Sequence, residues 1–287
     1  MSAYAKPDIK KLSPALGAEI LGKDIKQLLA TVPLSLLREQ FNDYLKAHQV
    51  LFFRNQDLAP DDLVKFAELY GPVGEYPFAK GLSQNPKVIP IIKEPHQTSN
   101  FGGIWHTDST YLAKPSMGSV LYAVEVPETG GDTMWANAYM AYDYLSDGLK
   151  SALENLRVVC SANKNKAKLR ADHLKDGSMK GENTAEMDIK QATHPIIRTH
   201  PLTGRKALYL SKAHVTHFEG WTEAESAPLL DHLYAHQIKE EFTCRFQWTA
   251  GTLAIWDNRC TVHYPLNDYH GHRREMWRVT VDGDVPV

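Results

Sequence analysis

The segment IWHTDSTYLAKP, residues 104 to 115, places a histidine and an aspartate two positions apart. Side chains alternate between the two faces of an extended segment, so His106 and Asp108 are predicted to point to the same side. An imidazole and a carboxylate side by side can be two ligands of one metal ion whose third ligand comes from elsewhere in the fold. The alternative is structural, a His–Asp hydrogen bond at a turn.

The best candidate for the third ligand is His263, in the segment AIWDNRCTVHYPLND. It follows the strand-like run 252–257 and lies in a stretch that is crowded with polar groups. Two histidines and one carboxylate on one face of a metal leave three coordination positions open. That arrangement is typical of non-haem Fe(II) that binds a co-substrate and O₂.

Two arginines four residues apart, Arg274 and Arg278, lie in the segment RREMWRVTV. If this segment is a strand, both point to one face. An inward arginine needs an anionic partner because an unpaired buried charge is strongly disfavoured, and a dicarboxylate or sulfonate could bind it bidentately. Thr133, which follows Gly-Gly-Asp, is a candidate hydroxyl donor to the same anion. The structural alternatives are an ion pair of Arg278 with Asp282 or Asp284, and a Thr133 hydroxyl bonded to the backbone.

The composition is that of an ordinary globular chain of 287 residues, with 43% hydrophobic residues, 23% charged residues and a net charge of -2. No Lys/Arg block stands out, so we expect neither nucleic acid nor a membrane as a partner. Three cysteines without CxxC spacing favour a reducing compartment. The N-terminus has no apolar run of signal-peptide length, and no run elsewhere could span a bilayer. We therefore expect a cytoplasmic protein.

The elements that must position these groups are mostly short strands. Apolar periodicity predicts helices over 33–49 and 59–71. Two further helices are expected near 138–156 and 222–238, and Thr222 and Glu225 form a possible capping box at the start of the second. Short β-like runs separated by turn signals occur at 50–56, 87–92, 119–126, 132–137, 194–201, 206–211, 252–257 and 274–281. The chain is polar and Lys-rich near 161–192, which indicates a surface insertion that is either a lid or a plain solvated excursion. The pattern favours a mainly β fold with flanking helices, a sandwich or jelly roll, in one domain over residues 1–287.

At this point the chain resembles a known family, the taurine dioxygenase/2,4-dichlorophenoxyacetate dioxygenase (TauD/TfdA) group of Fe(II)- and 2-oxoglutarate-dependent oxygenases. The resemblance covers nearly the whole chain, and the spacing agrees from block to block. The segments that carry it are LGAEILGKDI, WHTDSTY, PETGGDTMWAN, HPIIRTHPLTGRKALYLS and WDNRCTVHYPLNDYHGHRREMWRVTVDGD.

The resemblance implies His106, Asp108 and His263 as iron ligands, with 2-oxoglutarate and O₂ as co-substrates. It implies that Thr133 and Arg274 hold the distal carboxylate of 2-oxoglutarate. Arg278 is then expected nearer the metal, in a catalytic position close to both the 2-oxo acid and the acidic group of the primary substrate. The implied fold is the double-stranded β-helix, a cupin-like jelly roll with helical insertions. A homodimer or homotetramer is the assembly that the family suggests.

The implied function is hydroxylation of a C–H bond in a small anionic molecule, such as a sulfonate, a sulfate ester, an aryloxyalkanoate or another carboxylate. Two alternatives stay open: a biosynthetic hydroxylase or desaturase of an amino-acid-like metabolite, and a non-catalytic jelly-roll module that binds a ligand. The residues expected to contact the substrate are Tyr76, Phe78, Asn100, Ser109, Tyr111 and His214.

Three departures from the taurine-specific branch argue against taurine itself. Segment 70–81 has no histidine, and Tyr76 stands at that position. Gly102 replaces an asparagine, and His214 replaces a pocket aromatic.

Overall fold

The computed structural model describes residues 8–74, 79–164 and 190–287. Its largest element is a seven-stranded sheet in the order β1-β2-β3-β13-β5-β15-β4, in which β2 and β3 run parallel and the other neighbours antiparallel. The strands are β1 (Ile9–Lys11), β2 (Ala18–Ile20), β3 (Val50–Phe53), β4 (Ile89–Lys93), β5 (Gly118–Glu125), β13 (Leu253–Asp257) and β15 (Arg274–Val281).

A three-stranded antiparallel sheet packs on one face of this large sheet. Its order is β12-β6-β14, with β6 at Thr133–Asn137, β12 at Thr243–Phe246 and β14 at Thr261–Pro265. Aromatic side chains fill the space between the sheets: Phe52 stacks on Phe246 at 3.8 Å between ring centroids and meets the edge of Trp135 at 5.3 Å. The expectation of a mainly β chain with flanking helices is confirmed.

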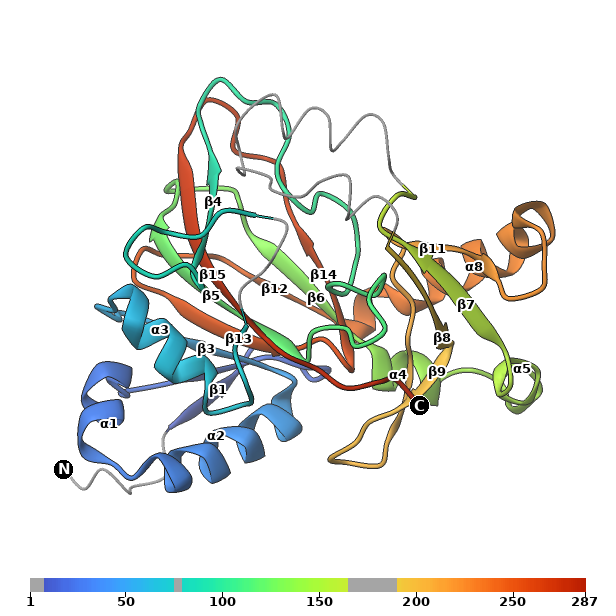
Figure 1. The fold of residues 1–287 in the computed structure, drawn as a ribbon, viewed down its shortest axis with the longest axis horizontal. Helices are drawn as coiled ribbons and strands as arrows, with labels where there is room; N and C mark the ends of the chain where they lie inside the picture. The colour runs from blue at the N-terminus through green and yellow to red at the C-terminus, as the bar shows by residue number, and fades with distance from the viewer. Residues whose placement is uncertain (1–7, 75–78, 165–189) are drawn as a thin grey trace.

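The other face of the large sheet is covered by α1 (Ile25–Thr31), α2 (Leu34–His48) and α3 (Pro60–Ala67), drawn in blue beside the sheet in Figure 1. In α2 the buried residues Leu37, Phe41 and Leu45 recur every four positions, so they form one apolar face of the helix. The helix ends where Gln49 adopts a left-handed conformation with φ of 60°.

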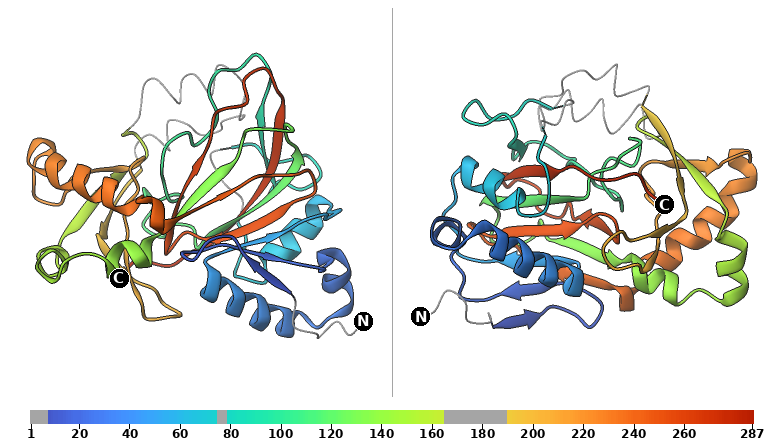
Figure 2. Two further views of the ribbon diagram at one scale, coloured as in Figure 1. Left: turned by 180° about the vertical axis from the view of Figure 1, so that it is seen from behind. Right: turned by 60° about the horizontal axis from the view of Figure 1, so that its bottom comes forward.

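A second group of elements lies at the opposite end of the molecule (Figure 2). It contains the sheet β11-β7-β8 and the pair β10-β9, packed with three helices around a core of their own. The bounds are α4 (Ala138–Asp143), α5 (Asp147–Leu153), β7 (Arg157–Ser161), β8 (Gln191–Pro195), β9 (Ile197–Thr199), β10 (Lys206–Leu208), β11 (Val215–Phe218) and α8 (Glu223–Gln237). Helix α8 begins with the Thr222–Glu225 capping box, as its sequence predicts.

Several boundaries differ from the sequence-based expectation. The helix near 138–156 is two helices, because Ser146 caps a new N-terminus at α5. The predicted strand 194–201 is two strands with a break at Ile196, and α3 ends at Ala67 rather than at Gly71. The insertion expected near 161–192 lies for the most part outside the described residues. Among the described residues, no helix is both long enough and apolar enough to cross a bilayer.

Candidate metal centre and co-substrate cavity

His106 and His263 are joined by their backbones. They form an isolated antiparallel bridge, in which His106 N donates to His263 O at 3.0 Å and His263 N donates to His106 O at 2.7 Å. Residues paired in this way project their side chains to the same face, and the two imidazole centroids are 4.0 Å apart. The candidate third ligand is thus brought to the first by a two-bond contact across 157 positions of sequence.

Asp108 completes the cluster, although its segment is not extended as predicted. His106 makes the bridge, and the chain then enters a turn in which Ser109 has a φ of 57°. The turn still brings Asp108 Oδ1 to 3.7 Å from His106 Nε2 and to 3.9 Å from His263 Nε2. The three ligand atoms lie within 4.8 Å of one another, and all three side chains are buried. The spacing leaves room for a divalent ion bound on one face.

The protonation states suit metal binding. Burial lowers the pKa of His106, with Asp108 opposing it, and burial lowers the pKa of His263 well below its ordinary value. Burial alone would raise the pKa of Asp108, but the neighbouring His263, Arg278 and His106 more than offset this and lower it. The histidines are therefore neutral and the aspartate ionised near neutral pH, which is the form that coordinates a metal.

A hydrogen bond orients the ring of His106, whereas the ring of His263 has none in the part of the chain that the structure describes. His106 Nδ1 lies 2.7 Å from Ile104 O, an acceptor that requires the proton on Nδ1 and leaves the Nε2 lone pair for a metal. His263 Nδ1 is buried and has no hydrogen-bond partner among the described residues. Its ring is instead held by packing, 4.8 Å from the Trp256 ring.

A cavity of about 50 Å³ runs from the two histidines toward Arg274. Besides the two histidines, its polar lining residues are Thr133, Arg274 and Arg278, three of the candidate site residues named from the sequence. Arg274 Nε and Nη2 are buried without hydrogen-bond partners among the described residues. Such donors are costly to leave unpaired, so this end of the cavity is built for an anion. The remaining wall was not identified from the sequence and consists of Ile91, Phe101, Gly102, Leu121, Trp256, Pro265 and Met276.

The contacts of Thr133 and Arg278 bear on the structural alternatives named above. Thr133 Oγ1 accepts a hydrogen bond from Trp248 Nε1 at 3.0 Å, so its own proton remains available to a ligand in the cavity. Arg278 Nη1 lies 3.9 Å from Asp108 Oδ1. The acid Asp284 pairs instead with Arg198, at 2.7 Å.

A second cation near Arg274 escaped the sequence analysis. Lys93 is 4% exposed, and its Nζ donates to Asn267 Oδ1 at 2.9 Å and lies 4.0 Å from the Tyr269 ring centroid. Burial lowers the pKa of Lys93, as does the nearby Arg274. Tyr269 also faces Arg274, at 5.9 Å. A lysine at the end of a strand gives no sequence signal of this neighbourhood, since its partners lie more than 170 positions away.

The residues expected to contact the substrate make separate sets of contacts. Tyr111 meets the edge of His214 at 5.0 Å, and His214 Nδ1 lies 2.8 Å from Thr110 Oγ1. Burial lowers the pKa of His214 to about 3, and His106 adds to the effect. Ser109 receives a 3.3 Å hydrogen bond from Ser116 Oγ.

Asn100 is also buried, but both protons of its amide nitrogen are engaged, by Pro265 O at 3.0 Å and Leu266 O at 3.2 Å. Tyr76 and Phe78 lie outside the described residues.

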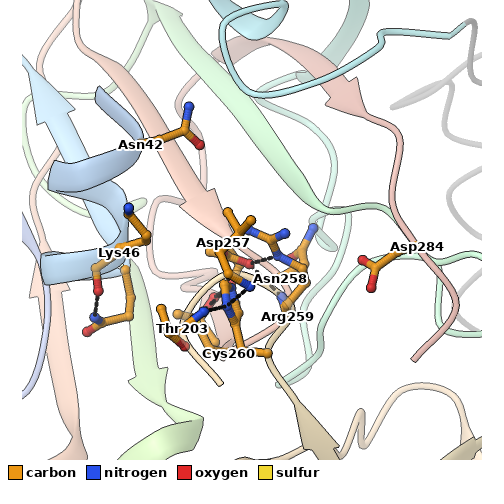
Figure 3. A network of polar contacts seen from close by, with 12 residues as sticks. Asn42, Lys46, Thr203, Asp257, Asn258, Arg259, Cys260 and Asp284 are labelled. Carbon is orange, nitrogen blue, oxygen red and sulfur yellow. Dashed lines mark hydrogen bonds and ion pairs between the residues drawn. The ribbon is translucent and has the colours of Figure 1, made fainter. Parts of the chain in front are cut away.

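A second buried cluster, His200, Asp257 and Cys260, also meets the distance criterion for a metal site. Figure 3 shows Asp257 and Arg259 at the centre of its polar contacts. Asp257 Oδ1 accepts from Arg259 Nε at 2.8 Å, and Oδ2 accepts from Arg259 Nη2 at 2.7 Å and from His200 Nε2 at 3.0 Å. His200 Nδ1 in turn accepts from the backbone N–H groups of Leu202 and Thr203. The lone pairs of Asp257 and His200 are thus already used, and the Cys260 thiol donates to Asp257 O at 3.8 Å.

Comparisons with known proteins agree with this geometry. The family model "Taurine catabolism dioxygenase TauD, TfdA family" matches residues 8–280. The chain is 32% identical to an alpha-ketoglutarate-dependent sulfate ester dioxygenase of Pseudomonas putida, over 98% of this chain and 91% of that protein. It is 30% identical to the alpha-ketoglutarate-dependent 2,4-dichlorophenoxyacetate dioxygenase of Cupriavidus pinatubonensis, with both chains fully covered.

Solved structures give the same result. A taurine dioxygenase from Burkholderia xenovorans superimposes with a TM-score of 0.80 at 32% identity, covering 98% of this chain and 93% of that one. AAD-2, in complex with Mn(II) and N-oxalylglycine, superimposes with a TM-score of 0.75 at 26% identity and 98% coverage of both chains.

The fold and the cluster thus define a 2-oxoglutarate-dependent dioxygenase, whose reaction requires Fe(II), 2-oxoglutarate and O₂. The chain belongs to the TauD/TfdA family.

Proposed function

We propose that His106, Asp108 and His263 hold the iron, and that the protein hydroxylates a C–H bond of a small anionic organic molecule. One observation carries this proposal. The three ligand atoms converge at one end of a cavity whose other end holds the unpartnered nitrogens of Arg274. A metal and a dicarboxylate co-substrate would fill the two ends. When bound, they supply the oxidant for hydroxylation, with succinate and CO₂ as co-products.

The protein's own residues bind and orient in this scheme. Arg274 and Thr133 take the distal carboxylate of 2-oxoglutarate, the arginine through its free Nε and Nη2 and the threonine through its hydroxyl proton. The apolar wall excludes water and leaves the co-substrate one orientation. Arg278, 3.9 Å from Asp108 Oδ1, acts beside the metal on the 2-oxo acid end and on the acidic group of the substrate.

Charge favours an anionic substrate. Two guanidinium groups and a divalent metal would face one carboxylate, Asp108, while the histidines are neutral. A dianionic co-substrate would offset only part of this positive charge, and a substrate anion would reduce the excess further. The P. putida relative acts on a sulfate ester and the C. pinatubonensis relative on an aryloxyacetate. We therefore place sulfate esters, sulfonates and aryloxyalkanoates or other carboxylates first among candidate substrates.

We assign His214 and Tyr111 to the substrate wall. The Nδ1 atom of His214 is engaged by the Thr110 and Ser211 hydroxyls, so Nε2 is the atom left for the substrate. A pKa of about 3 keeps this ring neutral, so it would act as a hydrogen-bonding group and not as a charge. Of the described residues, Asn100 and Ser109 complete the proposed substrate wall.

Gly102 supports the departure from the taurine-specific branch. It has a φ of 75°, and a Cβ there would lie 2.9 Å from His106 Cε1. An asparagine, which the taurine-specific branch has at this position, would press on the His106 ring unless the backbone moved.

We further infer that the two packed sheets form the double-stranded β-helix predicted from the sequence, and that residues 1–287 are one oxygenase domain. The similarity to solved dioxygenase structures over 98% of the chain supports both inferences.

The test is anaerobic reconstitution with Fe(II) and 2-oxoglutarate, followed by visible spectroscopy. Chelation of the keto acid to iron gives a weak charge-transfer band, and we expect this band to be absent in His106→Ala and Asp108→Ala. Absence of the band in folded, iron-loaded wild-type protein would contradict the proposal and favour a ligand-binding module.

Substrates are then screened by succinate formation with sulfate esters, sulfonates, aryloxyalkanoates and neutral analogues. Release of sulfate, sulfite or phenol distinguishes cleavage from simple hydroxylation of an amino-acid-like metabolite. Turnover with neutral compounds alone would contradict the anion proposal.

A further inference from the structure

The two oxygens of Asp108 have different surroundings. Oδ1 faces the cluster, 3.7 Å from His106 Nε2 and 3.9 Å from His263 Nε2. Oδ2 points away from it and accepts two hydrogen bonds, from Ser119 Oγ at 2.8 Å and from Asn258 Nδ2 at 3.1 Å. Ser119 and Asn258 are at most 1% exposed. Solvent therefore does not compete for these contacts.

We propose that Asn258 is a positioning residue that, together with Ser119, reserves Oδ2 and presents Asp108 to the metal through Oδ1 alone. The proposal rests on the assignment of Asp108 as a metal ligand made above. Two histidines and a carboxylate bound through one oxygen leave three positions of an octahedral metal open. A keto acid chelate occupies two of them and O₂ needs the third. A carboxylate bound through both oxygens would remove one of these positions.

The orientation of the Asn258 amide is itself fixed. Trp256 Nε1 can only donate, and it lies 2.9 Å from Asn258 Oδ1. The carbonyl side of the amide is therefore turned toward Trp256, and the NH₂ side is turned toward Asp108. The indole of Trp256 also packs 4.8 Å from the His263 ring. One tryptophan thus orients the partner of the carboxylate and supports one of the histidines.

The backbone of Asn258 is held from three directions. Its carbonyl accepts from Thr107 Oγ1 at 2.8 Å, and its N–H donates to Met117 O at 2.8 Å. Thr107 is the residue between His106 and Asp108, so this bond ties the metal-binding segment directly to the turn after β13. On the other side, Asp257 anchors the same turn through Arg259 (Figure 3). It also accepts a hydrogen bond from His200. The amide is therefore a rigid support and not an adaptable contact.

The test uses metal-free full-length protein and Co(II), whose d–d spectrum reports coordination number and geometry, with Fe(II) affinity measured in parallel under anaerobic conditions. We expect Asn258→Ala to weaken metal binding by about 10- to 100-fold, as loss of a hydrogen bond to a metal ligand typically does. We also expect it to change the Co(II) spectrum. Ser119→Ala acts on the same oxygen from another strand and should change the spectrum in the same direction.

Asn137→Ala is the matched control. Asn137 is 3% exposed, and its amide donates to Ala15 O at 2.7 Å without contacting Asp108. It caps α4, so its removal lowers stability. The control should therefore be destabilised in denaturant yet keep the wild-type metal affinity and Co(II) spectrum. This separates a positioning role from a merely structural one.

His106→Ala distinguishes a failure of the metal-ligand assignment from a failure of the role proposed for Asn258. If His106→Ala abolishes Co(II) binding while Asn258→Ala and Ser119→Ala keep the wild-type affinity and spectrum, the role of Asn258 is refuted and the metal assignment stands. If His106→Ala binds Co(II) as the wild type does, the assignment of the ligands is wrong and the role of Asn258 falls with it.

Discussion

Two buried clusters of similar composition border the same turn, the one that follows β13. The cluster of His106, Asp108 and His263 and the cluster of His200, Asp257 and Cys260 both bring potential ligand atoms within 4.8 Å of one another. In the second, Arg259 and His200 use both oxygens of Asp257, and backbone N–H groups use the remaining nitrogen of His200. In the first, Asp108 Oδ1 and the histidine Nε2 atoms face one another without a donor between them.

The difference is one of unused lone pairs. A His/Asp cluster closed by a guanidinium stabilises a turn, because every polar group has its partner. A cluster whose lone pairs converge on one point costs stability unless a cation binds there. The closed cluster anchors the turn after β13, and the open one has the geometry to bind a metal ion. Four predictions test this contrast, beginning with the largest expected effect.

Asp108→Ala should abolish metal-dependent turnover, whereas Asp257→Asn should leave the stoichiometry of metal binding at that of the wild type. A bound metal supplies several kcal/mol of stabilisation to the reacting groups, so turnover should fall by about 1000-fold or more. Equilibrium dialysis with Fe(II) or Co(II), together with succinate formation, measures both effects. If Asp257→Asn loses the bound metal and Asp108→Ala keeps it, the cluster of His200, Asp257 and Cys260 is the metal site instead.

The two buried arginines should respond with opposite signs when they are replaced. Arg259→Met strands the Asp257 carboxylate and should lower the free energy of unfolding by about 3–5 kcal/mol. Arg274→Met removes nitrogens that have no partner and should raise the stability of the metal-free protein by about 1 kcal/mol. The same variant should lose 2-oxoglutarate binding. Urea denaturation of the metal-free protein measures both changes in stability. If Arg274→Met destabilises the protein, the inference that Arg274 Nε and Nη2 lack partners is wrong.

Two glycines with left-handed backbone provide a matched pair, one beside each cluster. Gly102 has a φ of 75° and a virtual Cβ 2.9 Å from His106 Cε1, whereas Gly204 has a φ of 68° and nothing within 4 Å. Both alanine variants should lose about 1–2 kcal/mol of stability from backbone strain. Only Gly102→Ala should also weaken Co(II) binding, by about tenfold, because it displaces a ligand ring. Equal Co(II) affinities of the two variants would contradict the assignment of His106 as a metal ligand that Gly102 accommodates.

The smallest effect concerns pH. The pKa of His214, beside the open cluster, is lowered to about 3 in the folded protein, so the unfolded chain binds more protons between pH 6.5 and 3. This contribution to stability is complete above pH 6.5 and is lost as the pH falls, with a slope of at most about 1.4 kcal/mol per pH unit. His214→Gln should flatten the decline in metal-free protein between pH 7 and pH 5. Asp257, whose pKa is lowered, should begin to contribute only below its ordinary value near 4.

Much of the candidate site was predictable because imidazole, carboxylate and guanidinium groups can be recognised directly from the residue types. His106, Asp108, His263, Thr133 and Arg274 follow from spacing and from the family resemblance, and the structure brings all five to one cavity or its edge. Helix α2 was also predicted, from its apolar periodicity, and α8 was expected with its capping box. The shorter elements α1, β1 and β2 were missed because three to seven residues carry too little periodicity to be recognised.

The residues that support the ligands were not predictable in this way. Ser119, Asn258 and Lys93 are common polar residues whose role depends on partners 11, 150 and 174 positions away. The same limit affected His106 and Asp108. They do point to a common centre, but through a bridge and a turn and not through the extended segment that the spacing suggested.

The sequence by itself determined which groups were available: two imidazoles, a carboxylate, two arginines at strand spacing, and apolar runs long enough to bury them. The tertiary structure alone decided which lone pairs remained unused. Asp108 and Asp257 are the same residue type and both are buried, but Arg259 and His200 occupy both oxygens of Asp257, whereas Asp108 Oδ1 faces the two histidines. The physical reason is that a hydrogen bond forms only when donor and acceptor are about 3 Å apart, and each lone pair can accept few such bonds. Whether a polar group is free to bind a metal therefore depends on neighbours that only folding brings together.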